Sequence, residues 1–277
     1  MGYLEDRAGL QGKVGIVVGG GEGLGRAVAV DLGKAGVRLA LADKNESALE
    51  ETARTIADAG GSVDTAVFDA RDPEALGRFF EQVDNVYGDR LDILVNVVGG
   101  TFHQPFADTK PSGWDAIIRT NFTWLLHATH LAIPRMRAAG AGSIINITSI
   151  EGHRAAPNFA VYSGMKAAVN NFSRSLAVEL GPDNIRVNCI APDMVPTEGM
   201  GRIGGGAPPP IVDAGSRISI PMGRRGRRSR AIPPTTTAPP TPRTGATSPT
   251  SQCRPRDSRL IGSASSSTSG PPGAGFR

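Results

Sequence analysis

Residues 14–36 read VGIVVGGGEGLGRAVAVDLGKAG, and this stretch decides the fold. The apolar run at residues 14–18 predicts a buried strand. Over residues 25–35 the apolar side chains of Val28, Leu32 and Ala35 recur at helical spacing, which predicts a helix. Glycines between the two elements allow a tight turn and let the helix pack closely on the strand. The stretch therefore predicts a strand–turn–helix unit.

The alternation of strand and helix continues to about residue 190. Strands are predicted at residues 37–43, 63–70, 91–100, 142–149 and 185–192, and helices at residues 46–59, 73–87, 112–139 and 159–180. Helices between successive strands imply a parallel sheet with right-handed crossovers, and apolar strands imply that both faces of the sheet are covered. We expect one Rossmann-type, doubly wound α/β domain over residues 1–223.

Residues 224–277 differ in character. They hold 10 Arg and 9 Pro, are rich in Ser and Thr, and lack apolar periodicity, so we expect a disordered tail. Arginine without lysine in such a context is typical of a GC-rich gene read out of frame. The net charge is −6 up to Met200 and +10 from Gly201 onward, so the basic pI belongs to the C-terminal part. Only Phe276 supplies an aromatic ring to the tail, so nucleic-acid binding is not expected.

Several classes of protein are disfavoured by the remaining composition. Cys189 and Cys253 form no spacing pattern, so neither a disulfide framework nor a metal site is expected. No apolar run has the length of a membrane span, and residues 1–10 lack the apolar core of a signal peptide. We expect a cytoplasmic protein without a membrane partner.

The glycine turn is a candidate phosphate site. Gly19, Gly23 and Gly25 have the spacing Gly-x-x-x-Gly-x-Gly between the first strand and the first helix. Glycines here let backbone N–H groups approach a pyrophosphate at the start of a helix. Such turns also arise for packing alone, but the flanking strand and helix favour nucleotide binding.

Two acidic residues end the next two strands. Asp43 lies 18 residues beyond Gly25, where a carboxylate accepts hydrogen bonds from the adenosine ribose and repels a 2′-phosphate. Glu22 adds negative charge nearby, so we expect NAD in preference to NADP. Asp69 ends the third strand and is placed to touch the adenine. Both residues also fit an ordinary role at the end of a strand.

Ser149, Tyr162 and Lys166 form the candidate catalytic group. Tyr162 and Lys166 stand four residues apart near the start of a helix, hence on one face, and Ser149 ends the preceding strand. A tyrosine hydroxyl can give a proton to the alkoxide that hydride transfer to a ketone creates. A nearby ammonium is expected to lower the pKa of that tyrosine, and a serine hydroxyl to steady the substrate oxygen. A Tyr-x-x-x-Lys pair alone is also common on solvated helix faces.

Together these motifs resemble those of the short-chain dehydrogenases/reductases, over about residues 10–227. The matching segments are Gly19–Gly25, Asp43, Asn96–Gly100, Asn121, Asn146–Ser149, Tyr162–Lys166 and Ile185–Glu198. The resemblance implies a tetrad of Asn121, Ser149, Tyr162 and Lys166. The cofactor contacts it implies lie at Gly19, Gly23, Leu24, Gly25, Asp43, Asp69, Asn96, Gly99, Tyr162, Lys166, Val195 and Thr197.

The resemblance also implies a homo-oligomer, although the tail departs from the family's usual final helix and strand. Asn96 and Gly99 are expected beside the adenine ribose, and Val195 and Thr197 at the nicotinamide. Asp193 replaces the usual glycine of the loop beside the nicotinamide. Two loop residues near the expected active-site mouth, His153 and Arg154, are candidate substrate contacts; they also fit ordinary loop positions.

The leading hypothesis is an enzyme that transfers a hydride between NAD(H) and a secondary alcohol or ketone. An NADPH-dependent 3-oxoacyl-thioester reductase shares the motifs, but Asp43 argues against NADPH. A nucleotide-binding protein inactivated by an aberrant C-terminus is the alternative of another class.

Overall fold

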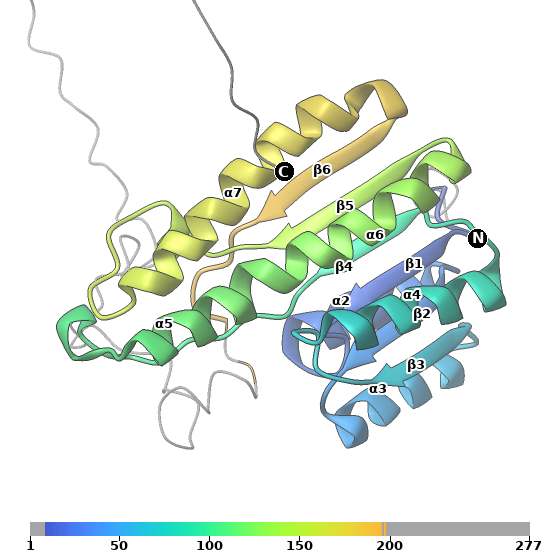
Figure 1. Ribbon diagram of the computed structural model, residues 1–277. Helices are drawn as coiled ribbons and strands as arrows, with labels where there is room; N and C mark the ends of the chain where they lie inside the picture. The colour runs from blue at the N-terminus through green and yellow to red at the C-terminus, as the bar shows by residue number, and fades with distance from the viewer. Residues whose placement is uncertain (1–8, 196, 198–277) are drawn as a thin grey trace, which may run out of the picture. The chain divides into compact units, whose positions relative to one another are not determined.

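The computed structural model describes residues 9–195 and 197. Six parallel strands in this part of the chain form one sheet in the order β3-β2-β1-β4-β5-β6 (Figure 1). The strands are β1 (Val14–Val18), β2 (Arg38–Asp43), β3 (Val63–Val67), β4 (Ile93–Asn96), β5 (Gly142–Ile147) and β6 (Ile185–Ile190). The chain runs outward from β1 in both directions, so the predicted doubly wound arrangement is confirmed.

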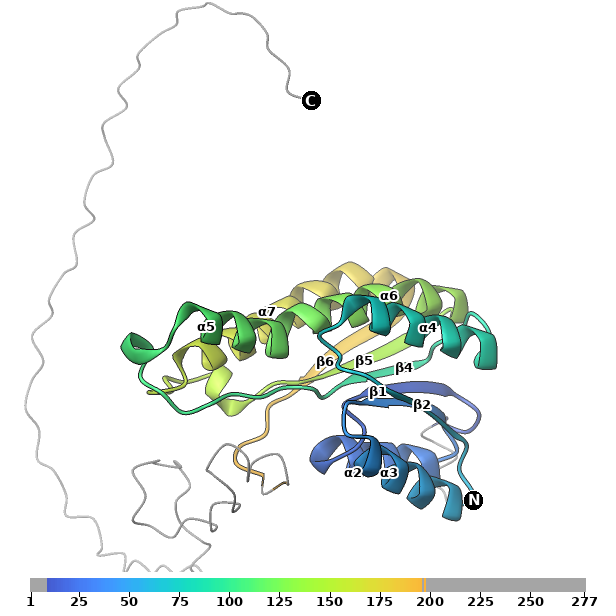
Figure 2. The ribbon, with the colours of Figure 1, turned by 60° about the horizontal axis from the view of Figure 1, so that its bottom comes forward.

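Helices cover both faces of the sheet (Figure 2). One face carries α2 (Gly23–Lys34) and α3 (Glu46–Asp58). The other carries α4 (Pro73–Tyr87), α5 (Pro111–Ile118), α6 (Trp124–Ala139) and α7 (Ala160–Leu180). The two layers leave the carboxyl ends of all six strands along one edge, where α/β proteins of this type bind their ligands.

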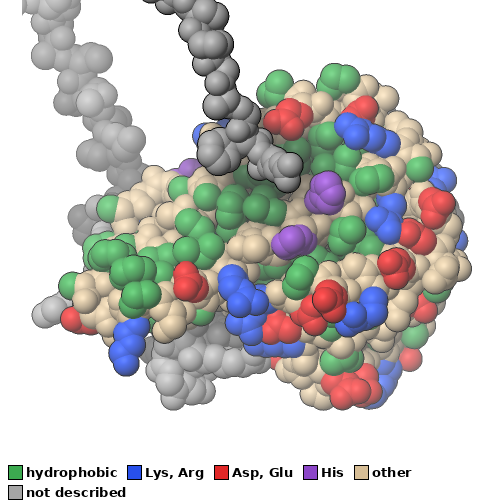
Figure 3. All heavy atoms as spheres, in the orientation of Figure 1, with side chains coloured by type: hydrophobic (Ala, Val, Ile, Leu, Met, Phe, Trp, Pro, Cys, Tyr) green, Lys and Arg blue, Asp and Glu red, His purple; other side chains and the backbone are tan. Residues whose placement is uncertain are grey.

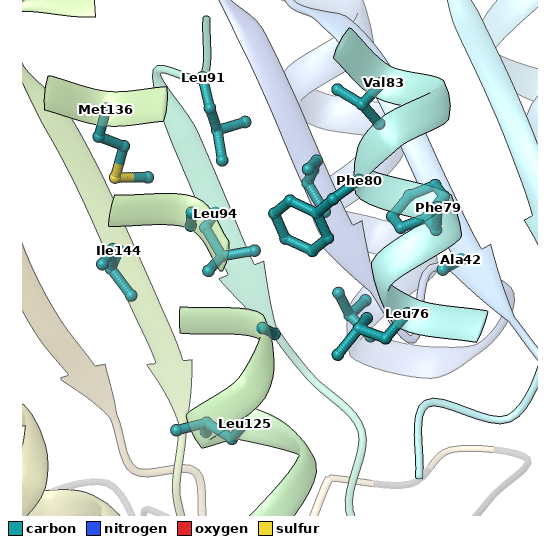
Figure 4. Packing of buried hydrophobic residues seen from close by; sticks show 14 of the residues in the cluster. Ala42, Leu76, Phe79, Phe80, Val83, Leu91, Leu94, Leu125, Met136 and Ile144 are labelled. Atoms are coloured by element: carbon teal, nitrogen blue, oxygen red, sulfur yellow. The ribbon is translucent and has the colours of Figure 1, made fainter. Parts of the chain in front are cut away.

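A separate apolar core lies on each side of the sheet. Toward α4, α6 and α7, side chains such as Phe80, Leu94 and Ile144 are fully buried (Figure 4). Toward α2 and α3, Leu41 and Ile56 belong to a second buried cluster. The strand β1 is buried along its whole length because both cores press on it.

The region predicted as one helix over residues 112–139 is interrupted. A π-helical turn, η2 (Arg119–Thr123), separates α5 from α6. Such turns widen the helix by one residue and are frequent at functional sites. Apolar periodicity does not reveal them, because both flanking helices keep the same buried face. The predicted tail and domain boundary at residues 224–277 lie outside the described residues.

The face shown in Figure 3 carries acidic and basic side chains interspersed over α4, and hydrophobic side chains near α5. In the described part of the chain no helix has the length and apolarity needed to cross a membrane. The same residues contain no cluster of His, Cys, Asp or Glu that could hold a metal ion.

Phe80 on α4 tests the larger core. Its ring is fully buried, lies 6.0 Å from that of Phe79 between centroids, and has the Arg135 guanidinium 5.2 Å from its centroid. We expect Phe80→Ala to lower the free energy of unfolding by about 3–5 kcal/mol, measured by urea denaturation. Val86 on the same helix is 57% exposed, so Val86→Ala should change stability by no more than about 0.5 kcal/mol. Equal losses in both variants would contradict this packing.

Candidate active site

A cavity of about 510 Å³ opens at the carboxyl ends of the strands. The glycine turn after β1 forms its floor, and the ends of β2 and β3 form one end. The loops after β4, β5 and β6 and the start of α7 form the other end. The strands β2 and β4 flank β1 on opposite sides, so the cavity lies at the switch point of the sheet.

The glycine turn brings α2 against the end of β1. Gly19 has a φ of +94°, which side chains rarely adopt. A Cβ on Gly25 would lie 1.7 Å from the carbonyl oxygen of Gly19, so no side chain fits there. The N-cap residue Glu22 makes no side-chain cap, and the first residues of α2, Gly23 and Leu24, line the cavity. This arrangement suits an anionic phosphate group.

Asp43 is fixed at one end of the cavity. One carboxylate oxygen accepts a hydrogen bond of 3.0 Å from Gly21 N, and the other accepts one of 3.0 Å from Asn45 N. The Asn45 side chain in turn donates to the Glu22 carboxylate at 2.5 Å. Two carboxylates are therefore held side by side on this wall, as the sequence predicts.

Asp69 also lines this end, but it is paired within the chain. The Arg71 guanidinium binds it in a forked ion pair, with distances of 2.9, 3.0 and 2.5 Å. The hydrogen bond from Arg71 lowers the pKa of Asp69. Arg71 lines the cavity as well, a position that the sequence analysis did not single out although it lies two residues after the predicted Asp69.

The Asn96 side chain does not reach the cavity, and a contact of this residue with an adenine ribose stays a prediction. Asn96 is 1% exposed and is absent from the cavity lining. Its amide nitrogen donates to Asn146 Oδ1 at 2.8 Å and to Thr129 Oγ1 at 3.4 Å, between β4, β5 and α6. Successive side chains of a strand point to opposite faces, and Asn96 points into the layer below α6.

Gly99 lies in the cavity wall beside the predicted catalytic residues. A Cβ on Gly99 would lie 3.0 Å from Asn121 Oδ1 and 3.1 Å from Lys166 Nζ. A side chain here would therefore displace one of these two groups. Gly99 keeps the loop after β4 close to the start of α7.

Ser149, Tyr162 and Lys166 meet at the opposite end of the cavity from Asp43. All three line it, Ser149 from the loop after β5 and the other two from the first turns of α7. The Lys166 ammonium lies 5.7 Å from the centroid of the Tyr162 ring and donates a 3.0 Å hydrogen bond to the carbonyl oxygen of Ile147. The Ser149 side chain lies near enough to the Tyr162 hydroxyl to lower its pKa. The predicted juxtaposition of hydroxyl, phenol and amine is therefore present.

The expected lowering of the tyrosine pKa is not found. Burial raises the pKa of Tyr162, the hydrogen bond with Ser149 lowers it, and the charge of Glu151 raises it. Lys166 is 3% exposed, and burial lowers its pKa to about 8. Both shifts have one cause, because a buried site disfavours the charged form of either group.

Asn121 ties the loop after β4 to the π-helical turn. Its amide nitrogen donates to the carbonyl oxygens of Gly100 at 2.7 Å and Ile117 at 2.9 Å, and its side-chain oxygen accepts from Gly100 N at 3.2 Å. The residue is 1% exposed. The side chain therefore acts as a clamp on Gly99 and Gly100. It holds them against the catalytic wall, the part of the cavity wall formed by Ser149, Tyr162 and Lys166.

The two candidate substrate contacts do not line the cavity. His153 Nε2 lies 3.1 Å from the Asn170 amide nitrogen, and Arg154 is bound to Glu151 at 2.6 Å. Their loop turns toward α7, because Gly152 packs on the backbone of that helix. That either side chain contacts a substrate therefore stays a prediction.

The loop after β6 closes the cavity. Asp193, Val195 and Thr197 line it, as predicted for the last two. A Cβ on Gly23 would lie 2.9 Å from the Thr197 methyl group, so this loop reaches the start of α2. The cavity thus runs between the glycine turn and the catalytic wall.

The comparisons with known proteins agree with this geometry. A family model described as short chain dehydrogenase matches residues 13–205.

The chain belongs to the short-chain dehydrogenase family.

Its relatives within the family include dehydrogenases and reductases. A tropinone reductase homolog from Arabidopsis thaliana is 34% identical over 193 residues, which is 70% of this chain and 60% of that relative's length. The crystal structure of an NAD⁺-bound xylitol dehydrogenase matches with a TM-score of 0.64 and 30% identity, covering 67% of this chain and 71% of that one. A carveol dehydrogenase from Mycobacterium avium in complex with NAD matches with a TM-score of 0.63 and 33% identity, covering 66% and 70%.

Removal of the Asn121 clamp tests the geometry of the site without a ligand. In Asn121→Ala we expect amide hydrogen exchange in residues 99–104 to accelerate about tenfold, because each hydrogen bond lost is worth about 1 kcal/mol. Asn45→Ala, which removes a helix cap at the other end of the cavity, should leave exchange in that segment unchanged. Unaltered exchange in Asn121→Ala would show that the loop is held by other contacts.

Proposed function

We propose that this oxidoreductase transfers a hydride between NAD(H) and a secondary alcohol or ketone. The proposal rests on one observation: a single cavity has a candidate cofactor site at one end and the candidate catalytic residues at the other. One end holds the glycine turn and Asp43, and the other holds Ser149, Tyr162 and Lys166. A dinucleotide spanning the cavity would place its ribose at the first end and its reacting ring at the second.

The residues present fit such a cofactor. The crowded contact at Gly25 leaves room for backbone only, so a pyrophosphate can approach the start of α2. Gly19, Gly23 and Leu24 line the cavity there, and Val195 and Thr197 line it from the loop after β6. The nicotinamide ring, when bound, supplies or accepts the hydride.

The catalytic wall supplies the proton. In ketone reduction the Tyr162 hydroxyl donates a proton to the carbonyl oxygen, and in alcohol oxidation its phenolate takes one back. The Ser149 hydroxyl donates a hydrogen bond to the same oxygen and steadies its developing charge. Lys166 holds a proton next to Tyr162, from a site where its own pKa is lowered to about 8.

Two carboxylates support NAD over NADP. The Asp43 carboxylate lines the cavity, and backbone N–H groups fix its position. Glu22 lies beside it, linked through the Asn45 amide. A ribose hydroxyl can donate to Asp43, whereas a 2′-phosphate would be repelled by both carboxylates. The NAD-bound structures of the two related dehydrogenases support the same choice.

Replacement of the proton donor tests the mechanism. Tyr162→Phe should lower kcat by about 100- to 10,000-fold in a panel of secondary alcohols, with NAD affinity kept within about threefold, because only the hydroxyl is lost. Tyr87→Phe is the matched control, since that hydroxyl bonds Leu39 O and Asp64 at β2 and β3 and does not line the cavity. Turnover in Tyr162→Phe within tenfold of the parent would rule out the assigned role.

Cofactor choice is tested by binding alone. Calorimetric titration should show tighter binding of NAD than of NADP to the parent protein. In Asp43→Ala the ratio of the Kd for NADP to the Kd for NAD should fall about fivefold or more, because the variant lacks a negative charge that would repel the 2′-phosphate of NADP. Asp58→Ala, at the exposed end of α3, should leave the ratio as it is. A parent protein that prefers NADP would overturn the assignment.

A further inference from the structure

The loop that carries Ser149 places a carboxylate beside the catalytic wall. Ser149 Oγ accepts a 3.2 Å hydrogen bond from Glu151 N, at the start of the short helix η3 (Ile150–Gly152). A Cβ on Gly152 would lie 2.8 Å from the backbone carbon of Lys166, so η3 is pressed directly onto α7. Glu151 is therefore held close to Tyr162, and its negative charge disfavours the tyrosine phenolate.

Arg154 binds this carboxylate with both ends of its guanidinium fork. Nη2 lies 2.6 Å from Glu151 Oε1, and Nε lies 3.3 Å from Oε2. The two side chains are 24% and 23% exposed, so water screens the pair only in part. A bidentate pair of this kind fixes the direction as well as the distance of the two charges.

The same guanidinium reaches across to the cavity wall. Arg154 Nη2 lies 3.7 Å from Asp193 Oδ1, and Asp193 lines the cavity. The backbone joins the two loops nearby, since Ile150 N donates to the Pro192 carbonyl oxygen at 3.0 Å. Arg154 thus lies between two acidic residues at the end of the cavity where proton transfer takes place.

We propose that Arg154 is a positioning residue for this reaction: it holds the Glu151 carboxylate in an ion pair and so limits the negative charge that acts on the Tyr162 hydroxyl. The inference rests on the proposed function in one respect: it takes Tyr162 to be the residue that transfers the proton. Arg154 itself touches neither the tyrosine nor the cavity. Its effect on Tyr162 passes through Glu151.

Other titratable groups near Tyr162 belong to three elements. On α7, Lys166 is buried, and burial lowers its pKa to about 8. On β6, the side chain of Cys189 lies near enough to Lys166 to act on its pKa, in the direction opposite to burial. In the loops, Asp193 shares Arg154 with Glu151, and His153 is bonded to Asn170. Arg154 is the cation that contacts Glu151 within the described residues, so its removal unmasks that charge directly.

The test follows the titration of Tyr162 itself. The chain has three tyrosines, so ¹³C labelling at the tyrosine Cζ gives a simple spectrum in which Tyr162→Phe identifies the signal. In Arg154→Gln we expect the pKa of Tyr162 to rise by about half a unit, because Glu151 is left unpaired. In Glu151→Gln it should fall by a similar amount. Arg154→Lys keeps the charge and should restore most of the parent value.

The double variant separates masking from general damage. If Arg154 acts by holding Glu151, Arg154→Gln should change the pKa of Tyr162 at least twice as much in the parent as in Glu151→Gln. Thermal unfolding of each variant shows whether the fold is intact. An equal shift on both backgrounds, or none in Arg154→Gln alone, overturns the proposal.

Turnover gives an independent readout. For the parent protein with NAD and a secondary alcohol, the rise of kcat/KM with pH reports the ionisation of the catalytic base. In Arg154→Gln that rise should move to higher pH by the same half unit. The tyrosine titration needs no substrate, so an inactive parent would refute the proposed function while leaving the effect of Arg154 measurable.

Discussion

The close approach of α2 to the turn before it is the constraint on which the site depends. A Cβ on Gly25 would lie 1.7 Å from the carbonyl oxygen of Gly19, so backbone meets backbone with no room for a side chain. This contact holds the start of α2 against the turn, where Gly23 and Leu24 line the cavity. It also places the start of α2 below the loop that carries Thr197, because a Cβ on Gly23 would meet that side chain. The two ends of the cavity are thereby held at a set separation.

The end of the cavity that holds Tyr162 and Lys166 depends on burial, whereas the end that holds the glycine turn depends on close packing. Tyr162 and Lys166 are held in one wall where water is largely excluded, and the charged form of each is disfavoured there. The hydrogen bonds of Asn121 to Gly100 and the ion pair of Arg154 with Glu151 surround this wall with fixed polar contacts. Burial remains the largest cause of both pKa shifts.

Much of this could be predicted from the sequence, because it rests on local patterns. The glycine spacing, the apolar strands and the Tyr-x-x-x-Lys pair predict a parallel, doubly wound sheet and many of the residues that line the cavity. The side to which Asn96 points depends on its hydrogen bond with Asn146 from another strand, a long-range contact that local patterns do not reveal. The direction of the Tyr162 pKa depends on burial and on Glu151, neither of which spacing reveals. The same holds for Arg154, whose partners come from η3 and from the loop after β6.

A crystal structure of the chain with NAD tests the central claim most directly. The account predicts that the adenosine ribose hydroxyls lie within hydrogen-bond distance of the Asp43 carboxylate, and that the pyrophosphate lies against the start of α2. It also predicts that the nicotinamide ring lies next to Tyr162 and Lys166, with one face open to the Tyr162 hydroxyl. A dinucleotide bound elsewhere, or one whose nicotinamide points away from Tyr162, would contradict the account.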